Sequence, residues 1–203
     1  MKKLCVFLDN GHGSNTSGKC SPNGLFREYK WARDIVKRLH VKLNNMGIMT
    51  FNVTPEDQDV ALSVRVNRIN KKYAELKKEG YECILISVHN NAAGNDKKWH
   101  SACGWSVFVS KNSSAKSKEL AKLLYEQCEA RNLKGNRWTQ SGKYWEANYT
   151  ILAKTNCPAV LTENMFMDNK TDYNFLNRMD GCQAIIDLHV DGIMKYKEYL
   201  ENL

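Results

Sequence analysis

The chain has 203 residues, of which 42% are hydrophobic and 26% are charged, an ordinary balance for a soluble globular protein. Only three prolines and the lack of a low-complexity tract argue against long disordered linkers, so we expect a single domain over residues 1–203. The formal net charge of +8 fits either simple solubility or a polyanionic partner, and the dispersed lysines argue against nucleic acid as that partner.

The predicted elements alternate between strands and helices. Leu4–Leu8 is a continuous apolar run, which is typical of a strand buried on both faces. Apolar residues recur at helical spacing from Phe26 to Met46, where Gly47 is placed to end the helix. Cys83–Val88 is the clearest strand, because it is β-branched and has polar neighbours on both sides. The other predictions are strands at Ile48–Val53, Trp105–Val109 and Ala159–Thr162, and helices over Leu62–Leu76, Leu120–Cys128 and Ile185–Leu200.

This alternation predicts an α/β fold with one largely parallel, twisted sheet and helices on both faces. One stretch, Leu133–Ala147, has no clear period and is predicted to be a long loop. Its aromatic residues Trp138, Tyr144 and Trp145 lie among Gly, Ser, Asn and Lys. They are predicted either to line a substrate groove, with Trp145 as a substrate contact, or to cover a flank of the core.

Neither a membrane span nor a disulfide framework is predicted. The longest apolar runs are about five to seven residues, whereas a spanning helix needs about 20. The apolar segment before Asp9 is shorter than the roughly 7–15 residues of a signal peptide, so we expect no signal peptide and no stable membrane insertion. Seven cysteines without a CxxC pair are predicted to be reduced thiols.

Ionisable side chains follow three of the predicted strands. His12, in the string LDNGHGSN, follows the first strand, His89 follows Cys83–Val88, and Glu163 follows Ala159–Thr162. Ligands bind where the strands of such sheets end, so these side chains can meet. Glu28, at the start of the first helix, is the fourth candidate.

These residue types match the chemistry of a catalytic zinc. Two imidazoles and one carboxylate, here His12, Glu28 and His89, are a known ligand set that leaves a fourth position for water. A second carboxylate that is not a ligand, here Glu163, can take the proton of that water and pass it to a leaving amine.

Each of these residues also fits an ordinary role. A histidine after a strand is often a loop or cap residue, and Glu28 suits the positive end of a helix. Glu163 could cap a following helix. His40 and His189 lie within predicted helices and are not expected to bind zinc, whereas His100 lies in a polar loop that could touch substrate.

Six motifs in order resemble the zinc-dependent N-acetylmuramoyl-L-alanine amidases of the type 3 family. VFLDNGHG is similar to the strand and turn that usually reads DPGHG, and LFREYKWARDIVKRL to the helix that bears the family's glutamate. ALSVRVNRIN is similar to a helix of pattern L-x-x-R-x-x-x-x-N, and ILISVHNNAA to a SIHANA segment. CGWSVFV and YTILAKTNCPAVLTENMFMDN are similar to the strands that follow, so the resemblance spans nearly the whole chain.

The resemblance implies an enzyme that cleaves the amide between the lactyl group of N-acetylmuramic acid and the L-alanine of the stem peptide. It places Zn²⁺ on His12, Glu28 and His89, and the catalytic role on Glu163. It also implies peptidoglycan as the partner, action on the cell wall, and a phage lysis enzyme or a bacterial autolysin domain. We expect a monomer, made in the cytoplasm and released on lysis, or exported by other means.

The chain departs from the family pattern at three positions. Asn10 stands where a proline is usual, and Asn91 where an alanine is usual. Met165 replaces a glycine that usually follows the catalytic glutamate by two, which is expected to alter the floor of the substrate groove. No departure removes a predicted ligand, and Asn90 and Asn91 are predicted to contact substrate.

Two other classes stay open on the sequence. One is a zinc peptidase that acts on stem peptides, which would leave a different product. The other is a non-catalytic basic module that binds glycan or nucleic acid, which would contain no stoichiometric zinc.

Overall fold

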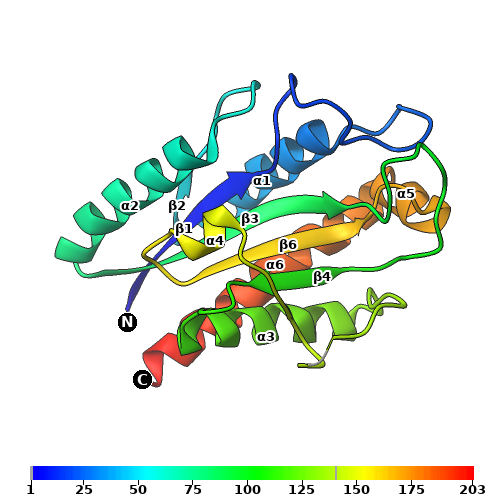
Figure 1. The fold of residues 1–203 in the computed structure, drawn as a ribbon. Coiled ribbons are helices and arrows are strands. Elements are labelled where there is room, and N and C mark those ends of the chain that lie inside the picture. The colour runs from blue at the N-terminus through cyan, green and yellow to red at the C-terminus, as the bar shows by residue number, and fades with distance from the viewer. Residues whose placement is uncertain (1, 140) are drawn as a thin grey trace.

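The computed structural model describes residues 2–139 and 141–203, and it arranges the chain as one sheet between two layers of helices (Figure 1). The strands are β1 Lys3–Asn10, β2 Met49–Asn52, β3 Tyr81–Asn91, β4 Ser106–Val109, β5 Trp145–Glu146 and β6 Ala159–Phe166. The helices are α1 Glu28–Asn45, α2 Leu62–Lys78, α3 Ala115–Ala130, α4 Thr150–Ala153, α5 Lys170–Leu176 and α6 Met179–Glu201.

The sheet has the strand order β2-β1-β3-β6-β4-β5. The pairs β1–β2, β1–β3, β3–β6 and β4–β5 are parallel, and β4 runs antiparallel to β6. The predicted largely parallel sheet is therefore confirmed. The central strands β1, β3 and β6 end at the same edge, which places the segments that follow them side by side (Figure 1).

Alternating residues of the central strands build two separate cores, because successive side chains of a strand point to opposite faces. On β3, Ile84 and Ile86 belong to the first core with α1, α3 and α6. Leu85, between them, belongs to the second core, which α2 and α4 cover. Both faces of the sheet are thus buried, which explains why β1 and β3 read as unbroken apolar runs.

The helix α1 shows how sequence periodicity is realised. Trp31, Ile35 and Leu39 recur at four-residue spacing and are all buried against the sheet. Gly47 follows the helix with φ = 75°, a left-handed conformation that glycine adopts without strain. The helix begins at Glu28 and not at Phe26, because the backbone of Phe26 accepts a hydrogen bond from Ser21 N in the preceding loop.

Several short elements are absent from the predictions. The helices α4 and α5 have four and seven residues, too few for a clear period. The two-residue strand β5 lies at the end of the predicted loop and pairs with β4. Between Arg131 and Tyr144 the described residues form turns and irregular structure, as predicted.

Two other expectations can be compared with the structure. All seven cysteines lie in its described part and are free thiols, as predicted. Three of them, Cys5, Cys83 and Cys157, pack within the second core. No helix of residues 2–139 and 141–203 has both the length and the apolar run that crossing a bilayer requires.

Candidate metal-binding active site

The turn after β1 explains why glycines surround His12. A Cβ atom at Gly11 would lie 2.4 Å from the ring of His89, and one at Gly13 would lie 1.9 Å from the backbone nitrogen of Asp59. His12 itself has φ = 59°, in the left-handed region that non-glycine residues rarely adopt. The two glycines therefore let neighbouring segments close tightly around a histidine held in one conformation.

His12, Glu28 and His89 converge at the edge where β1 and β3 end. One ligand atom of each lies within 4.8 Å of the other two. Glu28 joins the histidines, with Oε2 3.5 Å from Nε2 of His12 and Oε1 3.1 Å from Nδ1 of His89. The rings of the two histidines meet edge to face with centroids 5.2 Å apart. The structure thus brings together all three residues that the sequence predicts as ligands.

Glu28 is fixed by its position at the start of α1. Its side chain is 1% exposed, and Oε1 accepts a hydrogen bond of 3.0 Å from the backbone nitrogen of Asn90. Burial acts to raise the pKa of Glu28, but the contact with His89 and the nearby imidazoles lower it below its usual value. Burial lowers the pKa of His12 to about 4, so its ring is neutral at neutral pH and free to bind a metal.

Glu163 lies beside this cluster on the neighbouring strand. It is paired in register with His89. His89 and Glu163 follow Leu85 and Leu161 at even spacing, so both point to the face of the second core. Burial raises the pKa of Glu163 to about 7, and the charges of Lys19 and Arg137 act to lower it. Its Oε2 is buried and has no hydrogen-bond partner among the described residues.

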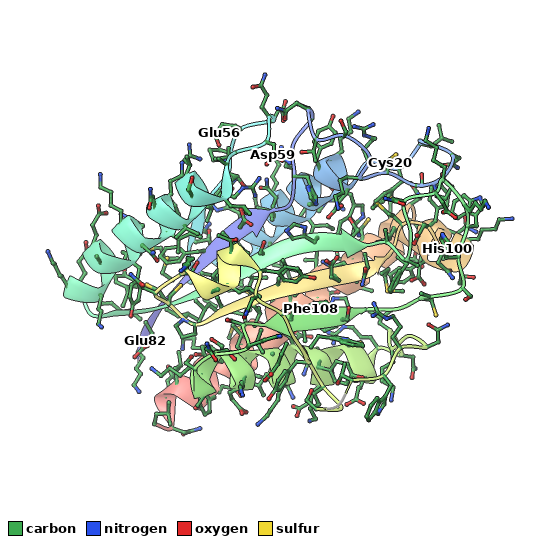
Figure 2. All side chains as sticks on the ribbon, in the orientation of Figure 1. Cys20, Glu56, Asp59, Glu82, His100 and Phe108 are labelled. Atoms are coloured by element: carbon green, nitrogen blue, oxygen red, sulfur yellow. The ribbon has the colours of Figure 1, made fainter. Side chains whose placement is uncertain are left out.

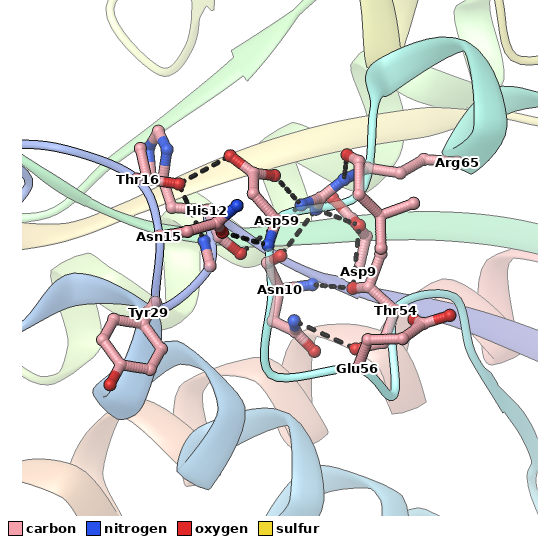
Figure 3. A network of polar contacts seen from close by, with 12 residues as sticks. Asp9, Asn10, His12, Asn15, Thr16, Tyr29, Thr54, Glu56, Asp59 and Arg65 are labelled. Carbon is pink, nitrogen blue, oxygen red and sulfur yellow. Dashed lines mark hydrogen bonds and ion pairs between the residues drawn. The ribbon is translucent and has the colours of Figure 1, made fainter.

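A buried ion pair supports the His12 turn from the face of α2 (Figure 3). Arg65 is 2% exposed, and its Nη1 donates to Oδ1 of Asp9 at 2.8 Å and to the carbonyl oxygen of Asn10 at 2.6 Å. Its Nη2 contacts Asp59 at 2.8 Å. The second oxygen of Asp9 accepts a hydrogen bond of 2.6 Å from Ser87. This network joins β1, β3 and α2 immediately behind His12.

Arg33 of α1 secures the same turn from another side. Its Nη2 donates to the carbonyl oxygen of His12 at 3.0 Å and to that of Glu56 at 2.8 Å. No local sequence signal marks this role, because Arg33 lies in a helix where a basic residue is expected to be solvated. Lys19 and Arg137, whose charges reach Glu163, were missed for a similar reason, since both lie in loops.

The residues predicted to contact substrate occupy different places. Asn90 is 4% exposed, and its amide nitrogen donates to the backbone of Asn164 at 2.6 Å, which makes it part of the frame around Glu28. Asn91 is partly exposed and accepts from the nitrogen of Ala92 at 2.9 Å. The contacts of both with substrate stay predictions.

Trp145 is half-buried on the flank of the second core. Its ring stacks on Phe108 with centroids 6.1 Å apart, and the guanidinium of Arg137 lies 4.7 Å from its centre. Tyr144 packs against the first core, whereas Trp138 is 77% exposed. Trp145 therefore has a packing role, and its predicted role as a substrate contact stays a prediction.

The three other histidines lie outside the cluster. His40 contacts Thr50 and Asn44 on the surface of α1. His189 is fully buried in α6, where its Nε2 lies 3.1 Å from Oγ1 of Thr162. His100 lies 2.9 Å from the carboxylate of Asp96.

A bulge in β6 lies next to Glu163. The pairing with β3 shifts between the pairs His89–Glu163 and Asn91–Phe166, so β6 has one extra residue there. Met165 lies in the bulge and has φ = 65°, the left-handed conformation that favours glycine. Its side chain is buried in the first core. Backbone geometry thus favours, at this position, the glycine that the resemblance leads us to expect.

The residues present fit a divalent metal. Two imidazoles and one carboxylate, all anchored on rigid elements, match the donor set of a catalytic zinc site with an open position. The unpartnered oxygen of Glu163 lies on the adjacent strand, on the residue paired with His89.

Fold and site together define an α/β protein with a histidine–glutamate–histidine site that could hold a metal ion, at the edge where its parallel strands end. The chain belongs to the N-acetylmuramoyl-L-alanine amidase family, whose profile matches residues 6–195. The expected family membership and fold are confirmed.

Individual relatives agree with this assignment. The chain is 29% identical over 195 residues to the endolysin of Bacillus phage SPP1, covering 95% of this chain and 65% of that protein. It is 30% identical over 192 residues to the N-acetylmuramoyl-L-alanine amidase LytC of Bacillus subtilis, covering 94% of this chain and 35% of that protein. The chain therefore spans about two thirds or less of the length of these curated relatives.

Solved structures share the fold. The crystal structure of an N-acetylmuramoyl-L-alanine amidase from Clostridium difficile 630 superposes with a TM-score of 0.82 at 22% identity, covering 98% of both chains. The catalytic domain of the CD27L endolysin has a TM-score of 0.69 at 23% identity, covering 96% of this chain and 98% of that one.

Proposed function

We propose that the protein is a zinc-dependent N-acetylmuramoyl-L-alanine amidase. It hydrolyses the amide between the lactyl group of N-acetylmuramic acid and the L-alanine of the stem peptide. The observation that carries the proposal is the convergence of His12, Glu28 and His89, with Glu163 on the adjacent strand, in a chain of this family.

His12, Glu28 and His89 would hold the metal. When bound, a zinc ion there would polarise the scissile carbonyl and make a water more acidic. The backbone nitrogen of Asn90 orients the Glu28 carboxylate, and Arg33 and Arg65 keep the His12 turn in place. The chain thus supplies a site whose ligands are fixed before metal or substrate arrives.

Glu163 would move the proton. Its pKa near 7 leaves a large share of the carboxylate ionised at neutral pH, so that it can accept a proton from the attacking water. The same carboxyl group, once protonated, donates to the nitrogen of the departing L-alanine. A general acid–base group works best when its pKa lies near the working pH, which is where burial places that of Glu163.

We propose peptidoglycan as the substrate and the cell wall as the place of action. The net charge of +8 favours contact with anionic envelope polymers. Family relatives include a phage endolysin and bacterial amidases, so a lysis enzyme and an autolysin both fit this chain.

The decisive experiment measures zinc content and turnover on the same preparations. Glu163→Gln should keep about one zinc per chain and lose at least 10²–10⁴-fold in turnover, because only the proton carrier is removed. His12→Ala and His89→Ala should lose both zinc and activity. Loss of zinc in Glu163→Gln would make Glu163 a ligand, and turnover within a few-fold of the parent would remove it from the mechanism.

Product analysis separates the amidase from a zinc peptidase. An amidase releases intact stem peptides with a free L-alanine amino group from purified peptidoglycan. Peptides shortened at their carboxyl end would identify a peptidase instead. A protein that binds peptidoglycan without zinc and without any product would be a binding module.

A further inference from the structure

A groove of about 530 Å³ opens next to the metal-binding cluster and has no part in the reaction described above. One wall is formed by residues 17–24, which follow β1, and the other by the segment 92–98, which follows β3. Met167 and Asp168, at the end of β6, contribute to its lining. Cys20 of the first wall and His100, just beyond the second, lie at the same end of the molecule, far from Glu82 (Figure 2). We call this feature the lysine groove.

The lysine groove has an excess of positive charge. Its charged lining residues are Lys19, Lys97, Lys98 and Asp168, so three positive charges and one negative give a formal +2. None of the ion pairs within residues 2–139 and 141–203 includes any of these lysines. Asp96, the acidic residue of the same segment, is already held by His100 at 2.9 Å. The ammonium groups are therefore available to an external anion.

Backbone geometry singles out two of these lysines. Lys19 has φ = 42° and Lys97 has φ = 58°, both in the left-handed region that non-glycine residues seldom adopt. Such conformations cost free energy and are typically retained at ligand-binding positions. Solubility alone would not require lysine at a position where glycine or asparagine is favoured.

The groove adjoins the reaction centre. The carbonyl oxygen of Lys19 accepts a hydrogen bond of 3.1 Å from the backbone nitrogen of Glu28, one of the predicted ligands. Ala92 of the groove lies three residues beyond His89, and Met167 four beyond Glu163. A substrate that is cleaved at the cluster can thus extend directly into the groove.

Asp168, at the end of β6, fixes the second wall of the groove. Asp168 is 4% exposed, and its Oδ2 accepts from the backbone nitrogens of Ala93 at 2.7 Å and Gly94 at 3.0 Å. Its Oδ1 is buried and unpartnered within the part of the chain that the structure describes. Asp168 therefore holds the segment 92–98 from inside the fold, and it leaves the lysines as the charged groups that a ligand can reach.

We propose that the lysine groove binds the stem peptide through its free carboxylates, on the amine side of the scissile amide. This proposal rests on the proposed amidase function. The N-acetylated sugars of a glycan strand have no charge, whereas the stem peptide has carboxylates at its branched and terminal positions. Lys97 and Lys98 pair with these carboxylates.

The test compares two soluble muramoyl peptides that differ only in whether the carboxylates of the peptide are free or converted to carboxamides. The variant is Lys97→Gln with Lys98→Gln. Lys19 is left intact, because its charge also reaches Glu163. The control is Lys37→Gln with Lys195→Gln, which removes the same charge from exposed positions on α1 and α6 that lie outside the groove.

We expect the groove variant to raise KM for the free-carboxylate peptide about 10-fold, since two exposed ion pairs are each worth a few-fold in binding. Its kcat, and its KM for the amidated peptide, should match those of the parent and the control. An equal rise in KM for both peptides, or the same rise in the control variant, would overturn the proposal.

Binding of the released stem peptide, measured by calorimetry, gives a readout that does not depend on turnover. The groove variant should bind this peptide about 10-fold more weakly than the parent, and the control should bind it as the parent does. If the parent cuts neither muramoyl peptide, the proposed function fails, and this binding result still decides the groove. If the parent and the groove variant bind the peptide equally, the groove proposal fails even when cleavage is normal.

Discussion

Arg65 is expected to couple stability of the fold to metal binding, and Arg65→Met tests this directly. The guanidinium and the carboxylate of Asp9 are at most 3% exposed and lie 2.8 Å apart. Methionine keeps much of the apolar stem of Arg65 but leaves Asp9 buried without its cation. Removing one partner of a buried pair costs about 3–5 kcal/mol, since the remaining charge is uncompensated.

Few other contacts can replace Arg65 as the partner of the Asp9 carboxylate. Its Oδ2 keeps the hydrogen bond of 2.6 Å from Ser87, but its Oδ1 keeps only a weak one of 3.3 Å from Thr54. The substitution also removes the bond of 2.6 Å from Arg65 to the carbonyl oxygen of Asn10, two residues before His12. We therefore expect the free energy of unfolding to fall by the whole of this penalty, about 3–5 kcal/mol. We also expect metal affinity to fall about 10-fold, which is in the range that supporting residues contribute to metal sites.

Urea unfolding of metal-free protein gives the free energy of unfolding, and titration with zinc gives the affinity. Asp9→Asn combined with Arg65→Met should be less destabilised than the sum of the two single variants, because neither partner is then left charged and alone. The reasoning is refuted if Arg65→Met lowers the free energy of unfolding by less than about 1 kcal/mol. It is also refuted if the double variant loses as much free energy of unfolding as the two single variants added together.

Three further outcomes are expected. Met165→Gly should be about 1 kcal/mol more stable than Met165→Ala in thermal unfolding, because φ = 65° favours glycine; the reverse order, usual within strands, would contradict the bulge geometry. Burial lowers the pKa of His189 to about 4 from its usual 6.5, so its contribution to stability is present above pH 6.5 and is lost as pH falls toward 4, by up to about 3 kcal/mol. In urea unfolding, the difference in free energy of unfolding between His189→Gln and the parent should change between pH 6.5 and pH 4. A difference that does not depend on pH would refute this. Trp145→Ala should lower the free energy of unfolding by about 2 kcal/mol through lost stacking on Phe108; unchanged stability with a several-fold higher KM would support the substrate contact instead.

The sequence predicted the cluster because its residues follow apolar runs that are long enough to recognise. His12 and His89 follow buried strands, and parallel strands end at a common edge, so their meeting could be expected before the structure was known. The structure differs in detail: β3 and β6 continue through His89 and Glu163, since pairing between these strands extends to the bulge. Both residues thus sit within strands and not after them.

Other features have no local signal in the sequence. The antiparallel direction of β4 depends on the connection through residues 92–105, which has no periodic pattern. The contacts of Arg33 and Arg65 with the His12 turn join segments 21 and 53 residues apart. The bulge at Met165 depends on how β6 pairs with β3, which becomes visible only once the two strands are aligned.

The alternation of side chains along the central strands also limits how this chain can change in evolution. Asp9, His89 and Glu163 share a face with Phe7, Leu85 and Leu161 only because the two positions of each pair differ by an even number. Inserting or deleting one residue within β1, β3 or β6 would turn the functional side chain into the opposite core and bring residues of that core to the site. Changes of length are therefore tolerated in the loops, while the strands beneath the site can vary by substitution alone.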